Sequence, residues 1–431
     1  MSEAILRKPS LSSQDPAARP AAQPAVWLAR LALSEFRCYR AAVLEAHAGP
    51  VVLCGPNGAG KTNLLEAVSL LAPGRGLRRA RLSDMRRQAA GSEEAEGEAD
   101  AAAGWAVAAR VATPEGPREI GTGRDPGAGQ DPGPREGRQV ERRVVKIDGA
   151  LVRGQQGLGE ILSMVWLTPQ MDGLLREGPG GRRRFLDRLV YGFDPAHAGR
   201  VAAYEQSLRE RARLLKLGRA DDAWLSALED SMARHGTAIA AARRTLVARL
   251  NAACAEQGSA FPAAGLALEG ETEAWLEAGP ALLAEDRLRE RLAAARRDDG
   301  ESGGASAGPH RADLAVRHLT RETPAALCST GEQKALLLSI VLAHARLLTL
   351  ERGAAPLLLL DEVAAHLDPA RRGALYEEIR GLGAQAWLTG TELSVFAPLG
   401  DAAQFVRVEN ATLTPVPPVD PSVHDDGNGS P

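Results

Sequence analysis

The spacing of apolar residues follows two different periods along this chain, and each period predicts a different kind of element. Short apolar runs bounded by polar or glycine residues are typical of buried strands in a parallel sheet, and they occur at 51–54, 164–167, 357–360 and 386–388. In the middle of the chain apolar residues instead recur on helical stripes. One stripe contains Val201, Tyr204, Leu208 and Leu215, and a second, with near-heptad spacing, contains Leu225, Leu228, Met232, Ile239 and Leu246. The pattern predicts an α/β unit interrupted by an antiparallel pair of long helices between about 196 and 257.

Weaker patterns predict the remaining elements. Strands are expected at 27–33, 43–47, 105–111 and 313–319, and a hairpin at 143–152, where Asp148-Gly149 is a favoured turn pair. Helices are expected from Gly60 to about Leu71, over 283–295, after Ser329 to about Leu350, and from Asp368. We expect residues 298–308 to form a flexible loop that returns from the arm.

Four segments have compositions that disfavour a packed core. Residues 1–25 are rich in Ser, Pro, Ala and Arg and predict a disordered leader; a transit peptide also fits, although Glu3 and Asp15 disfavour it. Insertions of low complexity are expected at about 91–104, which is acidic, and at 113–138, which is rich in Pro and Gly. Residues 416–431 predict a disordered tail.

Composition narrows the classes of function. The chain has 431 residues and a formal net charge of −3, so any nucleic-acid site has to be a local basic patch. Its four cysteines lack metal-ligand or redox spacing, which is typical of a reducing cytoplasm. No apolar run looks long enough to span a bilayer. His235 lies on the second stripe with no partner nearby, so we expect a packed or half-exposed residue rather than a metal ligand.

The glycine-rich stretch that follows the strand at 51–54 predicts a nucleotide site. It has the Gly-x-x-x-x-Gly-Lys-Thr pattern, and its members are Gly55, Pro56, Asn57, Gly58, Ala59, Gly60, Lys61 and Thr62. A strand, a glycine loop and a helix start direct several backbone N–H groups at one anion. Lys61 is expected to reach the β- and γ-phosphates of ATP, and the Thr62 hydroxyl to bind Mg²⁺. The alternative is a glycine-rich turn that binds nothing, which the Lys-Thr pair in register disfavours.

A pair of carboxylates completes this prediction. Asp361 and Glu362 follow the buried strand 357–360, where the first acid is expected to hold Mg²⁺ and the second to polarise the attacking water. About 300 residues separate Thr62 from Asp361, far more than a simple nucleotide-binding fold needs. An ATPase head split by an inserted helical arm explains that separation.

Two arginine-rich stretches have two possible explanations each. The stretch between Arg75 and Arg87 is either a solvated loop or a surface that contacts a phosphate backbone. Arg182, Arg183 and Arg184 begin a helix and oppose its dipole, so they require an anionic partner or an acidic neighbour.

Several motifs, in order along the chain, resemble the RecF family of ABC-type, SMC-like ATPases, over roughly residues 27–410. Beyond the phosphate loop they include 36–39 (Phe-Arg-Cys-Tyr), 168–170 (Thr-Pro-Gln), 182–187, 308–313, 329–334 (Ser-Thr-Gly-Glu-Gln-Lys), 360–362, 367–368 and 389–391. The resemblance implies an ABC-type head with a mixed β-sheet and flanking helices. It places the head at 26–178 and 301–415 and the helical arm at 179–300.

The resemblance also implies roles for individual residues. Ser329 and Gly331 would cap the γ-phosphate bound by a second subunit, Gln170 would couple metal and water to the arm, and Asp368 would lie across the dimer. Glu362, Lys61 and Gln170 would then be the catalytic residues, with Thr62, Asp361 and Gln170 at the metal. Such proteins are weak ATPases that dimerise on ATP, bind duplex DNA beside single-strand gaps, and load RecA with RecR and RecO.

Two features distinguish this pattern from that of transporters. Thr330 replaces the glycine of transporter signatures, and Thr389 stands where transporters have histidine. Both agree with the RecF pattern and suggest slow hydrolysis. The long arm and Thr389 argue against an ATP-binding subunit of a membrane transporter, and Glu362 argues against a clamp that binds ATP without hydrolysing it.

Overall fold

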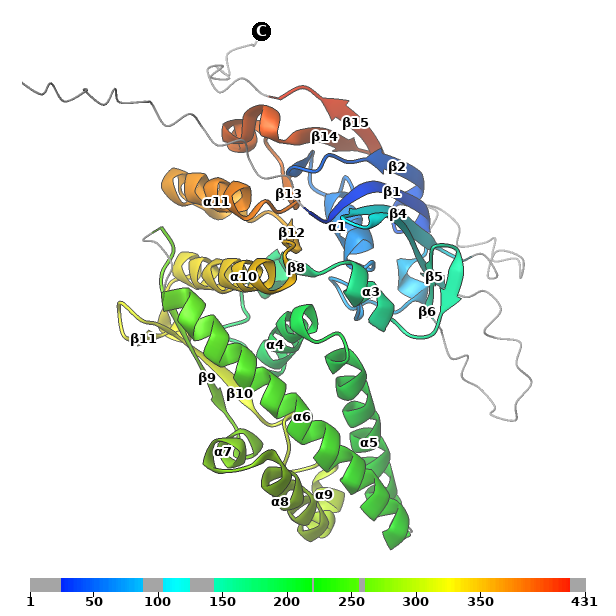
Figure 1. Cartoon of the computed structure of the whole chain (residues 1–431), viewed down its shortest axis with the longest axis vertical. Helices are drawn as coiled ribbons and strands as arrows, with labels where there is room; N and C mark the ends of the chain where they lie inside the picture. The colour runs from blue at the N-terminus through cyan, green and yellow to red at the C-terminus, as the bar shows by residue number, and fades with distance from the viewer. Residues whose placement is uncertain (1–24, 88–103, 125–142, 219–220, 256–259, 419–431) are drawn as a thin grey trace, which may run out of the picture.

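The computed structural model describes residues 25–87, 104–124, 143–218, 221–255 and 260–418. Two six-stranded sheets form a head, from which a helical arm extends (Figure 1). Helix α1 (Lys61–Ser69) lies between the sheets and contacts strands of both. Helices α10 (Thr330–Arg352) and α11 (Pro369–Leu382) flank the opposite side of the parallel sheet. The predicted fold class, an α/β ATPase head with an inserted helical arm, is confirmed. Residues 1–24, 88–103 and 419–431, where most of the leader, acidic insertion and tail are expected, lie outside the described residues.

The first sheet is antiparallel throughout and forms the outer layer of the head. Its order is β2-β1-β4-β5-β6-β7. The bounds are β1 (Trp27–Phe36), β2 (Tyr39–Glu45), β4 (Ala106–Thr113), β5 (Gly116–Arg124), β6 (Arg143–Ile147) and β7 (Ala150–Val152). The predicted hairpin turn is confirmed, because Asp148 and Gly149 between β6 and β7 both have positive φ, at 49° and 80°, as a primed turn requires. Helix α3 (Gln156–Ile161) then leads to the second sheet.

The prediction of an insertion at 113–138 was wrong in its first half, because residues 116–124 form strand β5. The strand pairs with β4 on one side and β6 on the other, and it buries Ile120 and Thr122. Gly123 is part of this packing, since a Cβ there would lie 2.6 Å from the carbonyl oxygen of Trp105. The glycine-rich composition predicted an interruption of secondary structure, whereas Gly123 permits the close approach of two backbones. The rest of the expected insertion, from residue 125, lies outside the described residues.

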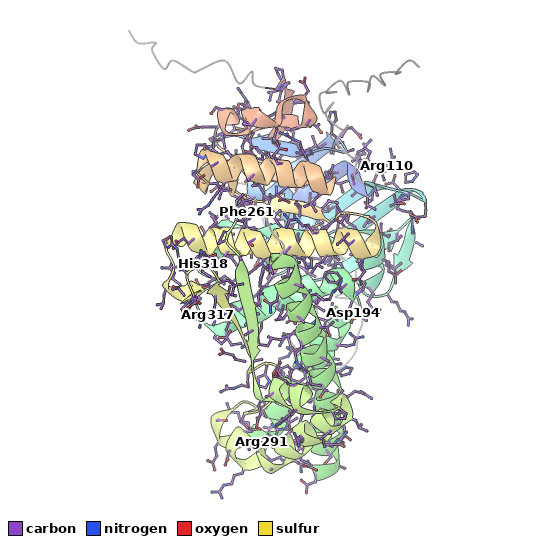
Figure 2. All side chains as sticks on the ribbon, turned by 60° about the vertical axis from the view of Figure 1, so that its left-hand side comes forward. Arg110, Asp194, Phe261, Arg291, Arg317 and His318 are labelled. Carbon is purple, nitrogen blue, oxygen red and sulfur yellow. The ribbon has the colours of Figure 1, made fainter. Side chains whose placement is uncertain are left out.

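The arm predicted at 179–300 consists mainly of helices, and those beyond its first helix pack around a separate small core. It contains α4 (Pro179–Phe193), α5 (His197–Leu217), α6 (Asp222–Ala255), α7 (Glu271–Ala278), α8 (Ala281–Ala294) and α9 (Arg296–Ser302). The predicted antiparallel pair is α5 and α6, and the second cluster of buried apolar residues includes Tyr204, Met232, Ile239 and Leu288. His235 on α6 is half-buried. Figure 2 shows Arg291 of α8 near the far end of the arm, and Arg317 and His318 closer to the head.

A three-stranded sheet closes the arm where the chain returns to the head. Its order is β11-β10-β9, with β9 (Ala264–Glu269), β10 (Asp313–His318) and β11 (Thr323–Pro324). The flexible loop predicted at 298–308 is wrong at its start, because residues 296–302 form α9. Asp299 of α9 is buried and accepts a hydrogen bond from Arg211 at 2.8 Å. This acid is held by an arginine distant in sequence, which the local Asp and Gly content cannot indicate.

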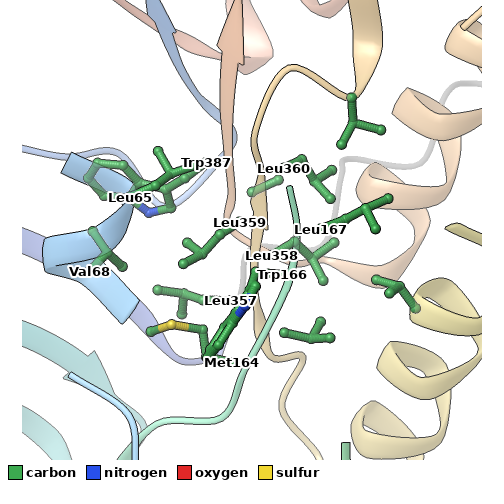
Figure 3. Close-up of a cluster of buried hydrophobic side chains, with 14 of the residues drawn as sticks. Leu65, Val68, Met164, Trp166, Leu167, Leu357, Leu358, Leu359, Leu360 and Trp387 are labelled. Atoms are coloured by element: carbon green, nitrogen blue, oxygen red, sulfur yellow. The ribbon is translucent and has the colours of Figure 1, made fainter. Parts of the chain in front are cut away.

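The second sheet is the core of the head and positions the functional residues. Its order is β15-β14-β3-β13-β12-β8, in which β14, β3, β13, β12 and β8 are parallel and β15 pairs antiparallel with β14. The bounds are β3 (Val51–Cys54), β8 (Met164–Leu167), β12 (Leu357–Leu360), β13 (Ala386–Gly390), β14 (Gln404–Glu409) and β15 (Thr412–Val416). Figure 3 shows the apolar side chains of β8 and β12 packed beside Leu65 and Val68 of α1. Val416 belongs to β15, so the predicted tail begins at least one residue too early.

Helix α10 corrects the expectation that no apolar run is long enough to span a bilayer. By length and composition it is the one candidate span in the described part of the chain. However, 78% of its apolar window is buried inside the protein, as in a core helix.

Candidate nucleotide-binding site

The phosphate loop has the conformation that its glycines allow. It connects β3 to α1 at the carboxyl end of the parallel sheet, and Gly58 and Gly60 have φ of 81° and 114°. A Cβ on Gly55 would lie 2.0 Å from the carbonyl oxygen of Val408, so that residue has to be glycine. Pro56, Asn57 and Gly58 are exposed at the turn, and Ala59 and Gly60 are buried behind it. The loop therefore presents its backbone to solvent directly before the N-terminus of a helix.

Lys61 is buried at the base of this loop. Its side chain is 4% exposed, and its Nζ donates hydrogen bonds to the carbonyl oxygens of Gly55 and Pro56, at 2.6 and 2.9 Å. The ammonium group thus lies inside the curve of the loop, where an anion would meet both it and the backbone N–H groups.

Three oxygen-bearing side chains meet beside the loop. The Thr62 hydroxyl lies 3.0 Å from Oδ2 of Asp361, and the Thr389 hydroxyl donates to Oδ1 of the same carboxylate at 2.7 Å. They come from α1, from the end of β12 and from β13, which are brought together by the parallel pairing of β12, β13 and β3. Asp361 is 2% exposed. A hydroxyl and a carboxylate converging in this way are the hard oxygen donors that Mg²⁺ prefers, so these residues fit that ion.

Glu362 has a strained backbone next to this cluster. Its φ is 54°, in the left-handed region that glutamate rarely adopts. Its N–H donates to the Thr389 hydroxyl at 2.8 Å, which helps to hold that conformation. Strain of this kind is concentrated at functional sites, where the surrounding structure fixes it. The sequence singled out Thr389 as a departure from transporters, but its bridge between Asp361 and Glu362 was not predicted.

The other predicted site residues lie on exposed turns of the same head. Gln170 is exposed in a short 3₁₀ turn after β8, the strand that neighbours β12. Ser329 caps α10 in a reciprocal capping box with Glu332, and Gly331 is exposed in its first turn. Asp368 caps α11 and accepts a hydrogen bond from the Arg371 N–H at 2.9 Å. These residues are presented to solvent, and the structure does not bring Ser329, Gly331 or Asp368 into the cluster around Asp361.

A buried acid on α1, which was not among the predicted site residues, anchors the helix through two arginines. Glu66 is fully buried, and both its oxygens accept hydrogen bonds from Arg37, at 2.7 and 2.8 Å. Arg78 also reaches Glu66, at 3.3 Å, and Asn63, at 2.8 Å. The family motif at 36–39 was the only sequence signal for this contact, because it includes Arg37 but does not indicate that Glu66 is its partner.

The arginines at the start of α4 are largely engaged within the chain. Arg182 forms two hydrogen bonds of 2.7 Å with Asp313, and Arg183 donates to the carbonyl oxygen of Ala312 at 2.6 Å. The Asp313 carboxylate raises the pKa of Arg182 through these hydrogen bonds. The acidic neighbour, one of the two predicted explanations, is therefore correct for Arg182.

Comparisons with known proteins agree on one family. Residues 27–410 match the family described as the RecF/RecN/SMC N terminal domain. The chain is similar to the DNA replication and repair protein RecF of Mesorhizobium japonicum, at 46% identity over 90% of this chain and 97% of that protein. It is also 44% identical to the RecF of Rhizobium meliloti, over 90% and 99% of the two chains. A solved structure described as the recombination mediator protein RecF-ATP in the RecFOR pathway has the same fold, with a TM-score of 0.74, 21% identity, and coverage of 92% and 99%.

Proposed function

The chain belongs to the RecF family of DNA replication and repair proteins, and from this premise we propose that it is an ATP-dependent DNA-binding protein of recombinational repair and replication restart. The observation that carries the proposal is the meeting of Thr62, Asp361 and Thr389 beside Lys61 at the end of a parallel sheet. Full-length similarity to repair proteins makes a transporter subunit the weaker alternative. We also propose that the arm begins near residue 179 and ends near residue 300, and that the ATPase head comprises the chain on either side of it.

ATP binding follows from the loop and its lysine. The backbone of Gly55 to Thr62 would surround the phosphates, and Lys61 would exchange its two carbonyl contacts for phosphate oxygens. When bound, Mg²⁺ would neutralise phosphate charge from a position held by Thr62 and Asp361. Gln170 would complete that position from the turn after β8. Support for ATP itself comes from the RecF structure described in its ATP form.

We further propose slow hydrolysis with Glu362 as the base that orients water. Glu362 follows the metal-binding acid and is held by Thr389 in a fixed backbone conformation. The side chain of Thr389 is already occupied by Asp361 and Glu362, so it is poorly suited to assist the γ-phosphate. A weak ATPase that serves as a conformational switch agrees with this arrangement.

A second copy of the chain would complete the site. Ser329 and Gly331 form an exposed helix N-terminus, which is suited to bind a phosphate carried by another subunit. Asp368 at the start of α11 would face the same interface. The expected partners are therefore an ATP-dependent homodimer, duplex DNA beside gaps, and RecR with RecO during loading of RecA. We place the protein in the cytoplasm, in agreement with its four free cysteines.

DNA binding would depend on dimerisation. A chain of net charge −3 has no general attraction for DNA, whereas two copies of the basic stretch Arg75–Arg87 on one face would contact more phosphates. Within that stretch Arg78 and Arg87 are paired with Glu66 and Glu35, so arginines such as Arg75 and Arg81 would make the contacts. Arg182 and Arg183, which the sequence analysis also considered, are engaged by Asp313 and Ala312 and are excluded from this surface.

One experiment tests the central proposal. ATPase rate and mass in solution are measured with and without gapped duplex DNA, for the parent protein, Lys61→Met and Ser329→Arg. We expect ATP to produce a dimer only in the parent. Lys61→Met should lose nucleotide binding, and Ser329→Arg should bind ATP but remain monomeric. Normal ATP affinity in Lys61→Met would remove the basis of the proposal, and an ATP-dependent dimer of Ser329→Arg would exclude the capping role.

A further inference from the structure

A cavity of about 550 Å³ lies between the head and the root of the arm. Its walls come from the loop after α1, from the turn before α3, and from α4 and α5. None of its lining residues belongs to the phosphate loop, so it is distinct from the ATP site. Its volume falls in the range of pockets for small ligands.

Arginines from both sides line this cavity without acidic partners. Arg75 and Arg79 come from the loop, and Arg184 comes from α4. Within the described ranges none of these three forms an ion pair, whereas Arg78 and Arg182, their neighbours in sequence, are paired with Glu66 and Asp313. All three residues are exposed to solvent, and unpaired guanidinium groups that face one space attract an anionic ligand.

The two acids in the lining do not balance this charge. Asp187 is buried and accepts two hydrogen bonds of 2.8 Å from Arg243, with His197 at 2.9 Å. Glu205 is the remaining acid; it lies 3.6 Å from Arg209 and also attracts Arg79, so a single carboxylate faces the arginines of the lining. Partial desolvation, followed by repulsion from Arg184 and Arg75, lowers the pKa of Arg79. The cavity therefore carries an excess of positive charge.

Two arginines of the lining, Arg79 and Arg188, have further unusual features. Arg79 has a φ of 56°, in the left-handed region that arginine rarely adopts. Arg188 lies over the ring of Trp166, 4.2 Å from its centroid, and its buried Nε has no hydrogen-bond partner within the described chain. Burial lowers the pKa of Arg188 to about 9, and Arg79 contributes in the same direction.

Beside Gln155 and Gln156, much of the remaining lining is apolar or aromatic, and it includes Pro73, Leu77 and the partly exposed ring of Tyr191. A phosphate has three or more acceptor oxygens for several guanidinium groups, whereas a carboxylate has two. An aromatic wall adds a surface on which a base can stack. We propose that this cavity binds a nucleoside phosphate, with the phosphate between Arg75, Arg79 and Arg184 and the base against the apolar wall. Either a free nucleotide or the phosphorylated end of a nucleic-acid strand has this chemistry.

The test uses the full chain carrying Lys61→Met, so that the phosphate loop does not contribute. Calorimetry measures binding of deoxyadenosine 5′-monophosphate, of deoxyadenosine and of inorganic phosphate. We expect the monophosphate to bind most tightly and deoxyadenosine not to bind. In that background Arg184→Glu should weaken binding about tenfold or more, because it replaces a charge-assisted hydrogen bond with repulsion. Arg287→Glu, an exposed arginine on α8, makes the same charge change away from the cavity and should leave affinity unchanged.

Arg79→Gly separates binding from folding. It removes a guanidinium and also relieves the left-handed backbone, so the affinity should fall while the melting temperature is kept or raised. A 5′-phosphorylated oligonucleotide and its unphosphorylated form identify the source. Tighter binding of the phosphorylated strand than of the monophosphate indicates a strand end, and equal or weaker binding indicates a free nucleotide.

Two results would overturn the proposal. One is monophosphate binding that Arg184→Glu and Arg79→Gly leave unchanged. The other is a glutamate-rich peptide that binds where the monophosphate does not, which would assign the cavity to an acidic protein segment. Neither result depends on ATP binding at Lys61, which is measured separately in the parent protein.

Discussion

Buried carboxylates have different hydrogen-bond partners in the arm and at the end of the parallel sheet. In the arm, Arg211 donates to Glu229 at 2.9 Å and to Asp299 at 2.8 Å, and all three side chains are 1% exposed. In the head, Asp361 instead accepts hydrogen bonds from the hydroxyls of Thr62 and Thr389. Burying a charge is costly unless an opposite charge lies close. A structural carboxylate is thus neutralised by the fold itself, whereas a carboxylate held by neutral hydroxyls remains available to a cation.

The largest effect is expected at the functional carboxylates, where chemistry rather than stability should suffer. Glu362→Gln keeps shape and hydrogen bonding but removes the base, so ATP turnover should fall about 10²–10⁴-fold. We propose that ATP hydrolysis separates the subunits and releases the DNA, so the variant should stay as an ATP-bound dimer on DNA. The measurement follows release from duplex DNA after excess competitor is added with ATP present. Release as fast as that of the parent would show that hydrolysis is not the switch.

In the arm we expect the opposite result, a loss of stability rather than of ATP turnover. Arg211→Met should lower the free energy of unfolding by about 3–5 kcal/mol, since Asp299 would be left buried without its arginine while Glu229 would keep only Arg296. Arg213 is exposed on the same helix. Arg213→Met should therefore change the free energy of unfolding by no more than about 0.5 kcal/mol. Urea denaturation measures both variants.

The matched change in the head sharpens the comparison. Asp361→Asn keeps the acceptor for Thr389 while removing a buried charge, so its stability should be close to that of the parent. ATP turnover should nevertheless be lost. If Asp361→Asn were as destabilising as Arg211→Met, the distinction between the two kinds of buried acid would fail.

Buried His344 gives a smaller and pH-dependent effect. Burial lowers its pKa to about 4, and its Nε2 donates to the carbonyl oxygen of Leu189 at 2.7 Å. The unfolded chain therefore binds a proton that the folded chain does not between about pH 6.5 and 4, and stability should fall by about 1.4 kcal/mol per pH unit across that window as the pH is lowered. Urea titrations at pH 7 and pH 5 should show a smaller pH effect in His344→Gln, which cannot be protonated; an equal loss in both proteins would assign the effect to other groups.

The smallest effect is expected from deleting residues 125–142 and joining the ends with a short Gly/Ser bridge. Arg124 and Arg143 are paired neighbours on β5 and β6, so a hairpin turn can join them. ATP affinity, DNA affinity and stability should change little, within about 1 kcal/mol. Deleting 113–138 instead would remove β5 from the middle of its sheet and should unfold the head. Similar stability of the two deletions would contradict the pairing of β5.

The sequence predicted the parts of this molecule that depend on local order. The apolar runs at 51–54 and 357–360 and the glycine loop were sufficient to place the strands of the parallel sheet and the start of α1. Strand β5 was missed because its Gly123 is required by a neighbour, Trp105, that lies outside the local window. The bridge made by Thr389 was missed for the same physical reason, and the acidic neighbour expected for Arg182 could not be identified as Asp313. Each joins residues that are adjacent only after the sheets and the arm have formed.

The pairing of Arg182 with Asp313 has a consequence for how the molecule can vary. These residues stand where the chain leaves the head for the arm and where it returns, and their two hydrogen bonds hold exit and re-entry side by side. A segment whose ends are fixed next to each other can be lengthened, shortened or replaced while the flanking sheets keep their pairing. The arm root is therefore a natural insertion point, at which a fluorescent or affinity module could replace the distal helices and report on the head without disturbing it.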